Sequence, residues 1–260
     1  MYQTIDGLIL ADTSLRESDK FLSVLTADRG RISLYGNHVR NIKRGAIPYT
    51  TPMQYCRFQV EVRGGRTTLR SGDVIHSFLD ITKDLCGFSL AQYVMDVVRE
   101  VTVEGGDEAD ILQLTLNTLH MIQAGKRSLT HIKATFEMRI MMLAGYMPDL
   151  GGCDICGRAQ GRMYFDIMNG ILICPDCHEL RDRGDTDNVD MGTARIIALL
   201  STSVLRGLRY VLSAPANRIF AYSIAEDEQQ EYADVCEKYI LNHLERGFDT
   251  LDFYKDVISM

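Results

Sequence analysis

Two Cys-x-x-Cys pairs, with residues 157–173 between them, constrain this 260-residue chain more than any other feature. The first pair is Cys153 with Cys156, and the second is Cys174 with Cys177. Each pair directs two thiolates at one point, so two pairs supply the tetrahedral sulfur set that Zn²⁺ prefers. Because four protein ligands leave no open coordination position, we expect one structural Zn²⁺ ion rather than a catalytic one.

The residues around these cysteines predict a small zinc ribbon at about 151–178. An Asn169-Gly170 turn between the two pairs favours a short hairpin. A thioredoxin-like redox role is less favoured, since that motif uses one Cys-x-x-Cys beside a βαβ unit. His178 follows the last cysteine and is an alternative ligand in a three-cysteine set, although a solvent-facing histidine is the preferred interpretation. Cys56 lies in the alternating pattern of a predicted strand and Cys236 on the apolar face of a predicted helix, so both are expected in the core.

The part of the chain over 1–79 has the pattern of short strands. Segments 3–10, 21–26 and 31–35 are apolar or alternate with period two, and Gly30 supplies the turn before the third. Segments 55–62 and 67–70 flank Arg63-Gly64-Gly65-Arg66 and predict a second hairpin. Five short strands in about 80 residues favour a small closed barrel, with the OB-fold as the leading candidate.

From Asp80 onward the apolar period changes to that of helices. Helices are predicted over 90–101, over about 108–124, from a Ser128 cap to 143, over 196–212 and over 232–244. The predicted fold is therefore a multidomain α+β chain. An OB-fold β-barrel over 1–79 precedes an all-α domain over 80–260, which carries the zinc-ribbon insertion.

Charge is divided unevenly along the chain. The net charge is −7, yet the part over 1–79 holds eleven Lys or Arg against seven Asp or Glu, a net of +4. The part over 80–260 carries −11. Between positions 29 and 70 there are nine basic residues and one acid, Glu61. This asymmetry predicts that the N-terminal part of the chain, over 1–79, binds a polyanion.

The candidate nucleic-acid contacts are the nine basic side chains of that stretch: Arg29, Arg31, Arg40, Lys43, Arg44, Arg57, Arg63, Arg66 and Arg70. OB-folds combine such cations with aromatic rings on which bases stack. Tyr35, Tyr49, Tyr55 and Phe58 are interleaved with them, while Phe58 is equally consistent with barrel core. The chain has no Trp, so stacking would depend on Tyr and Phe.

Sequence patterns typical of enzymes are missing. There is no Walker sequence, Gly-rich dinucleotide fingerprint, His-Glu-x-x-His or Gly-x-Ser-x-Gly. We therefore expect no enzymatic activity and no small-molecule substrate. No run approaches the roughly 20 apolar residues that cross a bilayer, and the first residues lack a signal peptide, so a cytoplasmic protein without membrane contact is expected.

Together these features resemble the RecO family of bacterial DNA repair proteins. The front resemblance rests on Gly7-Leu8-Ile9-Leu10, on residues 16–26 and on Gly30-Arg31-Ile32. The more specific part is mid-chain, where a helix over 136–143 is followed by Gly145, Pro148-Asp149-Leu150 and the cysteine pairs. The chain departs from the family at Tyr35-Gly36, where Lys-Gly is common.

The resemblance implies an OB-fold, a helical domain with a zinc-binding insertion, and a recombination mediator. Family members bind single- and double-stranded DNA and anneal complementary strands. They act with RecR to load recombinase onto DNA coated by single-stranded-DNA-binding protein, whose tail some of them also bind. Such a protein is cytoplasmic and associated with the nucleoid.

Three other functions are compatible with parts of the sequence. A zinc-ribbon transcription or RNA-binding factor would use the same parts but would not anneal arbitrary complementary strands. A metal-dependent hydrolase would need an open coordination site on the zinc. A protein scaffold would present the basic face to an acidic partner, and nucleic acid would not compete for it specifically.

Overall fold

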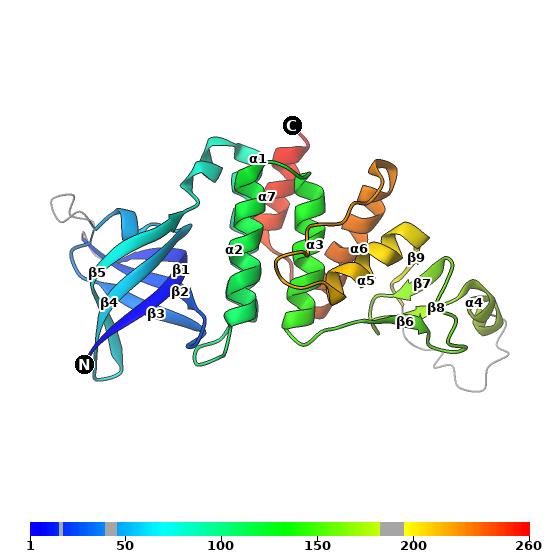
Figure 1. Ribbon diagram of the computed structural model, residues 1–260, viewed down its shortest axis with the longest axis horizontal. Coiled ribbons are helices and arrows are strands. Elements are labelled where there is room, and N and C mark those ends of the chain that lie inside the picture. Colours follow the sequence, from blue (N-terminus) through cyan, green and yellow to red (C-terminus); the bar gives the residue numbers. More distant parts are fainter. Residues whose placement is uncertain (16–17, 40–45, 183–194) are drawn as a thin grey trace. The chain divides into compact units, whose positions relative to one another are not determined.

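The computed structural model describes residues 1–15, 18–39, 46–182 and 195–260. The chain forms two compact units (Figure 1). Unit 1 comprises Met1–Lys126 together with Phe248–Met260, and unit 2 comprises Arg127–Gly247. No helix in the described ranges is long and apolar enough to cross a membrane.

Unit 1 begins with a five-stranded sheet that closes on itself. The strands are β1 (Tyr2–Leu15), β2 (Asp19–Thr26), β3 (Arg31–Gly36), β4 (Gln54–Arg63) and β5 (Arg66–Ser77). They pair in the order β1-β2-β3-β5-β4, and β4 pairs back to β1. The pairing between β3 and β5 is parallel, and the others are antiparallel. The five predicted strands are therefore confirmed, and β1 and β5 are longer than predicted.

The interior of this sheet is filled by the alternate apolar residues of each strand. Ile9, Leu22, Leu34 and Phe58 are buried in one cluster. Cys56 is also buried there, as the alternation predicted, and burial raises the pKa of its thiol to about 12. A short 3-10 turn, η2 (Pro48–Thr50), precedes β4. Phe58 thus belongs to the core and offers no ring to a ligand.

Three helices complete unit 1. After a 3-10 turn, η3 (Leu79–Lys83), come α1 (Leu85–Val101) and α2 (Ala109–Ala124). The third helix, α7 (Asp249–Ile258), returns after the whole of unit 2 and packs against α1 (Figure 1). The ring of Phe248 lies 5.7 Å from that of Tyr93 in an edge-to-face arrangement, and both side chains are buried.

The β2–β3 turn is joined to the segment between α1 and α2 by backbone hydrogen bonds. Gly30 has a φ of +63°, as its predicted turn position requires, and a Cβ there would lie 2.0 Å from the Val103 carbonyl oxygen. The amide of Arg31 donates to that same oxygen at 2.9 Å, and the amide of Gly105 donates to the Arg29 carbonyl. Only glycine fits this close approach.

The longer helices of unit 2 are α3 (Leu129–Leu143), α5 (Thr202–Ser213) and α6 (Gln229–His243), with a 3-10 turn, η4 (Glu226–Glu228), before α6. Ser128 caps α3 as predicted, since its hydroxyl accepts from the amide of His131. Where α3 packs on α6, the ammonium of Lys133 lies 2.9 Å from Glu137 and 2.8 Å from Glu237. Cys236 of α6 is buried, as predicted.

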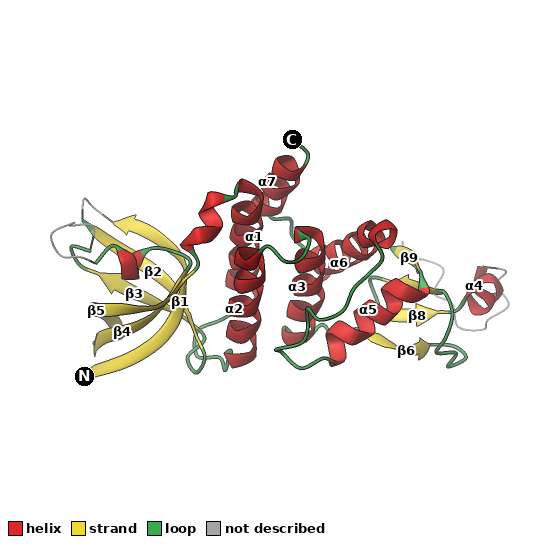
Figure 2. Ribbon diagram, turned by 45° about the horizontal axis from the view of Figure 1, so that its top comes forward, coloured by secondary structure: helices red, strands yellow, loops and turns green. Residues whose placement is uncertain are grey.

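A second, four-stranded sheet lies in unit 2 (Figure 2). Its strands are β6 (Asp149–Cys153), β7 (Met163–Asp166), β8 (Ile171–Ile173) and β9 (Ile197–Leu200), in the order β6-β8-β7-β9. A short helix, α4 (Pro175–Asp182), follows β8. The predicted hairpin at Asn169-Gly170 is confirmed by the antiparallel pairing of β7 with β8.

The prediction of one helix over 196–212 is wrong at its start. Residues 197–200 pair with β7 as strand β9, and Ser201 caps helix α5 at Thr202. Four apolar residues fit either a strand or a helical turn by periodicity alone, so tertiary pairing decided between them. The sheet consequently reaches Leu200, well beyond the ribbon's expected 151–178 range.

Candidate metal centre and nucleic-acid interface

Four cysteines meet at one point in unit 2. The sulfur atoms of Cys153, Cys156, Cys174 and Cys177 all lie within 4.8 Å of one another. The sulfurs of Cys156 and Cys174 are 3.7 Å apart. Three of the four side chains are buried and only Cys156 is exposed. The two predicted pairs therefore do converge.

Backbone hydrogen bonds set the positions of these thiols. Cys153 ends β6, and the Gly157 amide donates to its carbonyl at 2.8 Å to close the first turn. Gly157 allows this turn because its φ is +74°. Cys174 follows β8, and Cys177 lies within the first turn of α4. Two strand ends and one helix start thus bring the sulfurs together.

The electrostatics of the cluster favour thiolate at one position. Burial would raise the pKa of Cys153, but backbone amides of Cys174, Cys156 and Ile155 point at its sulfur and bring the pKa down to about 6. The Cys174 amide lies 3.3 Å from that sulfur. Burial raises the pKa of Cys177. Four converging sulfurs with amide support fit the donor set of a thiophilic divalent ion, so these residues can hold a metal.

His178 is not one of the four converging ligands. Its ring stacks on Tyr164 with 4.0 Å between centroids, and the side chain is half-buried. Tyr164 of β7 covers one side of the ring, so His178 faces solvent only in part.

The described basic residues of the 1–79 stretch lie at three places on the closed sheet. Arg29 and Arg31 occupy the β2–β3 turn. Arg29 donates to Gln3 Oε1 at 2.5 Å, and Arg31 donates through Nε to the Thr102 carbonyl at 3.2 Å. Both side chains are half-buried. They help to attach this turn to its neighbours, in addition to any role with a ligand.

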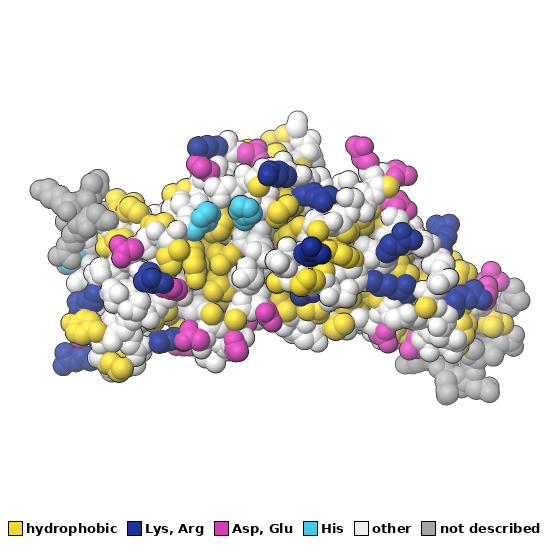
Figure 3. All heavy atoms as spheres, in the orientation of Figure 1, with side chains coloured by type: hydrophobic (Ala, Val, Ile, Leu, Met, Phe, Trp, Pro, Cys, Tyr) yellow, Lys and Arg dark blue, Asp and Glu magenta, His cyan; other side chains and the backbone are white. Residues whose placement is uncertain are grey.

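Arg57 and Arg70 are exposed on the outer face of the sheet, and each is paired with a carboxylate. Arg57 makes two hydrogen bonds, of 2.8 and 2.7 Å, to Asp6. Arg70 pairs with Glu61. These hydrogen bonds lower the pKa of both carboxyl groups. The face drawn in Figure 3 likewise shows Lys and Arg side chains interspersed with Asp and Glu.

Arg63 and Arg66 are exposed at the two ends of the β4–β5 turn, and they pair with each other in the strand register. Gly64 and Gly65 between them have φ values of +57° and +75°. Among the described residues neither arginine forms an ion pair. The guanidinium carbon of Arg66 lies 3.7 Å from the centre of the Tyr35 ring. Arg40, Lys43 and Arg44 lie outside the described residues.

Two aromatic rings lie side by side on the outer face of β2 and β3. Phe21 is the register partner of Tyr35, and their ring centroids are 5.5 Å apart. The sequence drew attention to Tyr35 but missed Phe21, which is 37% exposed. The sequence could have shown that Phe21 points outward, because side chains alternate along a strand and the next residue, Leu22, points inward. Tyr49 and Tyr55 are half-buried, and burial raises the pKa of both phenols.

Asp19 was also missed by sequence reasoning. Its carboxylate is buried and accepts hydrogen bonds from the Tyr35 hydroxyl at 2.6 Å and the His38 amide at 2.8 Å. The bond from Tyr35 is the main cause that lowers the pKa of Asp19. A buried acid at a strand start gave no sequence signal, because its partner Tyr35 belongs to the neighbouring strand and only the pairing of β2 with β3 brings the two together.

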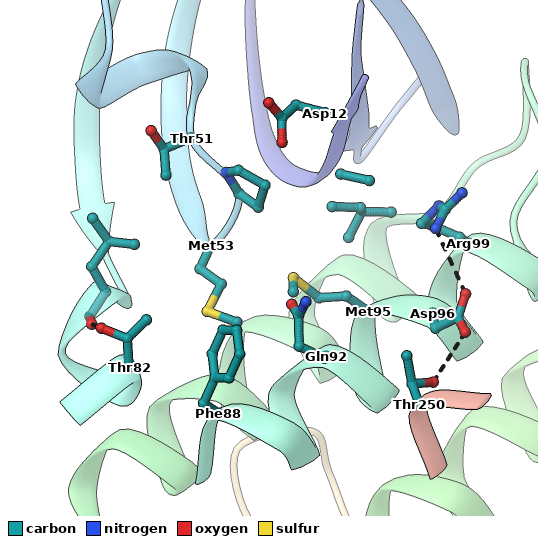
Figure 4. Close-up of a pocket in the computed structure, with 14 residues that line it drawn as sticks. Asp12, Thr51, Met53, Thr82, Phe88, Gln92, Met95, Asp96, Arg99 and Thr250 are labelled. Atoms are coloured by element: carbon teal, nitrogen blue, oxygen red, sulfur yellow. Dashed lines mark hydrogen bonds and ion pairs between the residues drawn. The ribbon is translucent and has the colours of Figure 1, made fainter. Parts of the chain in front are cut away.

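Unit 1 also contains a cavity of about 480 Å³ (Figure 4). Met53, Phe88 and Met95 line its apolar part. Asp96 accepts from the Thr250 hydroxyl at 3.0 Å and lies 3.6 Å from Arg99. The second acid of the lining, Asp12, is paired with Lys20 at 2.7 Å, so both carboxylates of this mainly apolar cavity already have partners.

Comparison with protein families identifies both parts of the chain. A family model described as recombination protein O, N terminal, matches residues 1–78. A second model, described as recombination protein O, C terminal, matches residues 83–252. The chain belongs to the RecO family. The RecO resemblance seen in the sequence is thereby confirmed, and the chain is a member of a DNA repair family.

Individual RecO proteins align with almost the whole chain. The DNA repair protein RecO of Acetivibrio thermocellus is 28% identical over 255 residues, which cover 98% of this chain and 96% of that protein. That of Desulforudis audaxviator is 27% identical over 261 residues, again 98% and 96%. That of Caldanaerobacter subterraneus is 23% identical over 248 residues, 95% of each.

Proposed function

We propose that this RecO-family chain is a DNA-binding recombination mediator that performs no covalent chemistry. In this proposal it binds single- and double-stranded DNA, anneals complementary strands and helps load a recombinase onto single strands coated by single-stranded-DNA-binding protein. The match of both family models, over 1–78 and 83–252, is the observation that carries the proposal. A mediator exchanges one set of phosphate contacts for another, so it needs no catalytic group.

The closed five-stranded sheet would act as the OB-fold of this mediator. OB-folds bind oligonucleotides on the face of strands 2 and 3, with help from the loops after strands 1 and 4. In this chain that face carries Phe21 and Tyr35, and the loop after β4 carries Arg63 and Arg66. Cations beside aromatic rings are the two elements that single-strand binding combines.

We propose that phosphate contacts come from the nine basic residues singled out in the sequence, with unequal availability. Among the described residues, Arg63 and Arg66 form no ion pair that phosphate binding would have to break. Arg57 and Arg70 would have to exchange Asp6 and Glu61 for phosphate. Such exposed pairs are weak, about 0–1 kcal/mol, so the exchange is feasible.

The four-cysteine cluster would hold one Zn²⁺ ion with a structural role. When bound, the ion would tie the turn after β6 to the start of α4, which is what a four-sulfur site supplies. This proposal makes no use of the metal in DNA chemistry.

The chain would be cytoplasmic and associated with the nucleoid. Its two domains would be residues 1–79 and 80–260, and its partners would be RecR and single-stranded-DNA-binding protein.

Fluorescence anisotropy with labelled single-stranded DNA, at a series of salt concentrations, tests the DNA-binding part. We expect log K to fall linearly with log salt, at about 0.7 per single-strand phosphate contact. The mediator part is tested by annealing of complementary oligonucleotides coated with single-stranded-DNA-binding protein. Failure to bind either form of DNA at low salt would refute the proposal.

A further inference from the structure

The Tyr35 ring is held by three different neighbours. Its hydroxyl donates to the buried Asp19 carboxylate, its ring lies beside Phe21, and the Arg66 guanidinium lies over it. The hydroxyl bond anchors the far end of the ring, because the carboxylate is itself held by the His38 amide. Tyr35 is therefore a rigid platform on the outside of the sheet.

Arg66 is the least constrained member of this group. It is exposed, it begins β5 at the end of a two-glycine turn, and it has no ion pair among the described residues. Its guanidinium lies 3.7 Å from the Tyr35 centroid but 6.0 Å from that of Phe21. A planar cation thus lies over the Tyr35 ring, where a planar base could stack.

We infer that Arg66 covers a base-stacking site that is specific for single strands. An unpaired base takes the place of the guanidinium on Tyr35, and Arg66 turns to the phosphate beside that base. This inference rests on the proposed DNA-binding function and assigns one site within it. Duplex DNA cannot use the site, because its bases are stacked inside the helix.

The exchange is favourable for two physical reasons. An exposed cation–π contact is weaker than the stacking of a base on an aromatic ring. The displaced guanidinium also gains a phosphate, with which it can form paired hydrogen bonds. The Asp19 bond keeps the ring in place during the exchange, so the site needs no rearrangement of the sheet.

The test compares Tyr35→Leu with Tyr35→Phe in anisotropy titrations on an oligothymidine and on a duplex of equal length. Loss of the ring should weaken single-strand binding roughly tenfold, while duplex binding should change less than about twofold. Tyr35→Phe keeps the stacking surface and loses only the Asp19 bond, so it should lose much less single-strand affinity than Tyr35→Leu. Circular dichroism melts of both variants verify that the sheet is folded.

A base-free oligonucleotide makes the test independent of folding. On an oligomer of abasic sites with the same phosphates, wild type and Tyr35→Leu should bind equally, because there is no base to stack. Arg66→Lys should keep the wild-type salt dependence, whereas Arg66→Gln should reduce the slope by about 0.7 on single strands.

The inference and the proposed function fail in different ways. If wild type binds no DNA, the proposed function is wrong. If wild type binds both forms but Tyr35→Leu weakens them equally, or weakens the abasic oligomer as much as the oligothymidine, the stacking site is wrong and DNA binding stands. Unchanged single-strand affinity in Tyr35→Leu would also overturn it.

Discussion

His131 shows how much a single buried side chain can contribute to pH dependence. It lies in α3 with 4% of its surface exposed, beside the rings of Tyr222 and Tyr232, and its Nε2 has no hydrogen-bond partner in the described structure. Burial, with a smaller effect of Arg127, lowers its pKa to about 4. The folded protein therefore keeps this imidazole neutral at pH values where an unfolded chain would protonate it.

The consequence is a loss of stability in mild acid. The unfolded chain takes up the proton below about pH 6.5 and the folded chain only near pH 4, so stability should fall as the pH drops between these values. Lowering the pH from 7.5 to 4.5 should reduce the free energy of unfolding of wild type by roughly 2 kcal/mol more than that of His131→Phe. Urea titrations at both pH values measure this, with the exposed His120→Phe as control. An identical pH profile for wild type and His131→Phe would contradict the assignment.

Glu61 gives a prediction of increased DNA affinity. It holds Arg70 in an ion pair on the outer face of the sheet, and Glu61→Gln removes the charge that competes with phosphate. We expect tighter binding of single-stranded DNA, about two- to fivefold, with a salt slope steeper by up to about 0.7.

Asp256→Asn is the matched control for Glu61→Gln, since it removes one negative charge from an exposed position of α7. Anisotropy titrations at two salt concentrations compare the two variants. Equal effects of both would show that only net charge matters, and Arg70 would then be no part of the DNA surface.

Single residues were predicted from the sequence where one residue type in a fixed spacing defines the chemistry. The cysteine pairs and the Gly30 turn are of this kind. The partners of Arg57 and Arg70 were not predictable, because they depend on the register of β4 with β1 and β5. The contact residues for DNA stay a prediction.

At the scale of elements, the turn that follows β6 in unit 2 depends on its cysteines. Residues 154–162 are all exposed, so apolar burial contributes little to holding this turn in place. Arg209 adds hydrogen bonds to the carbonyls of Leu150 and Ala159, at 2.7 and 2.9 Å.

We therefore expect one zinc ion per chain by mass spectrometry of the native protein, and its loss in Cys174→Ser. Metal loss should increase hydrogen exchange across β6 to α4 and leave β1–β5 unchanged, since the four cysteines tie together only that part of the chain. Cys86→Ser, outside the cluster, should keep the metal and the exchange pattern. Full metal content in Cys174→Ser would exclude the four-cysteine site.

Elements with a long, regular apolar period were predicted well, including α2 and the Ser128-capped α3. Short elements were not. β9 has only about as many residues as one helical turn, so its apolar period could not distinguish a strand from a helix. α7 is a short helix whose buried side the sequence did not single out. For α7, the deciding contact is with α1, and the whole of unit 2 separates these two helices along the chain.

At the scale of the whole chain, unit 1 is built from two distant stretches. Residues 248–260 supply α7, whose buried face consists of Leu251, Tyr254 and Val257 after the buried Phe248. Removing this segment would expose the α1 surface that it covers. The sequence predicted a division at residue 79 and gave no sign that the last residues return to the first unit.

Truncation after Gly247 should therefore destabilise unit 1, although it removes no strand of the sheet. Burying each large apolar side chain is worth about 1.5–3 kcal/mol, so the loss should be several kcal/mol. Urea unfolding followed by circular dichroism measures it. Truncation after Ile258, which removes only the exposed Ser259 and Met260, is the control. Equal midpoints for the two truncations would show that α7 is dispensable.

The return of α7 to α1 also orders events during synthesis. A ribosome releases the five strands first, then α1 and α2, and then every residue of unit 2, before it makes Phe248. While all of unit 2 is translated, the apolar surface of α1 in unit 1 stays uncovered. Unit 2 can finish folding earlier, because all its residues belong to one continuous stretch of chain. Unit 1 is therefore the first unit to be synthesised and the last to complete its fold.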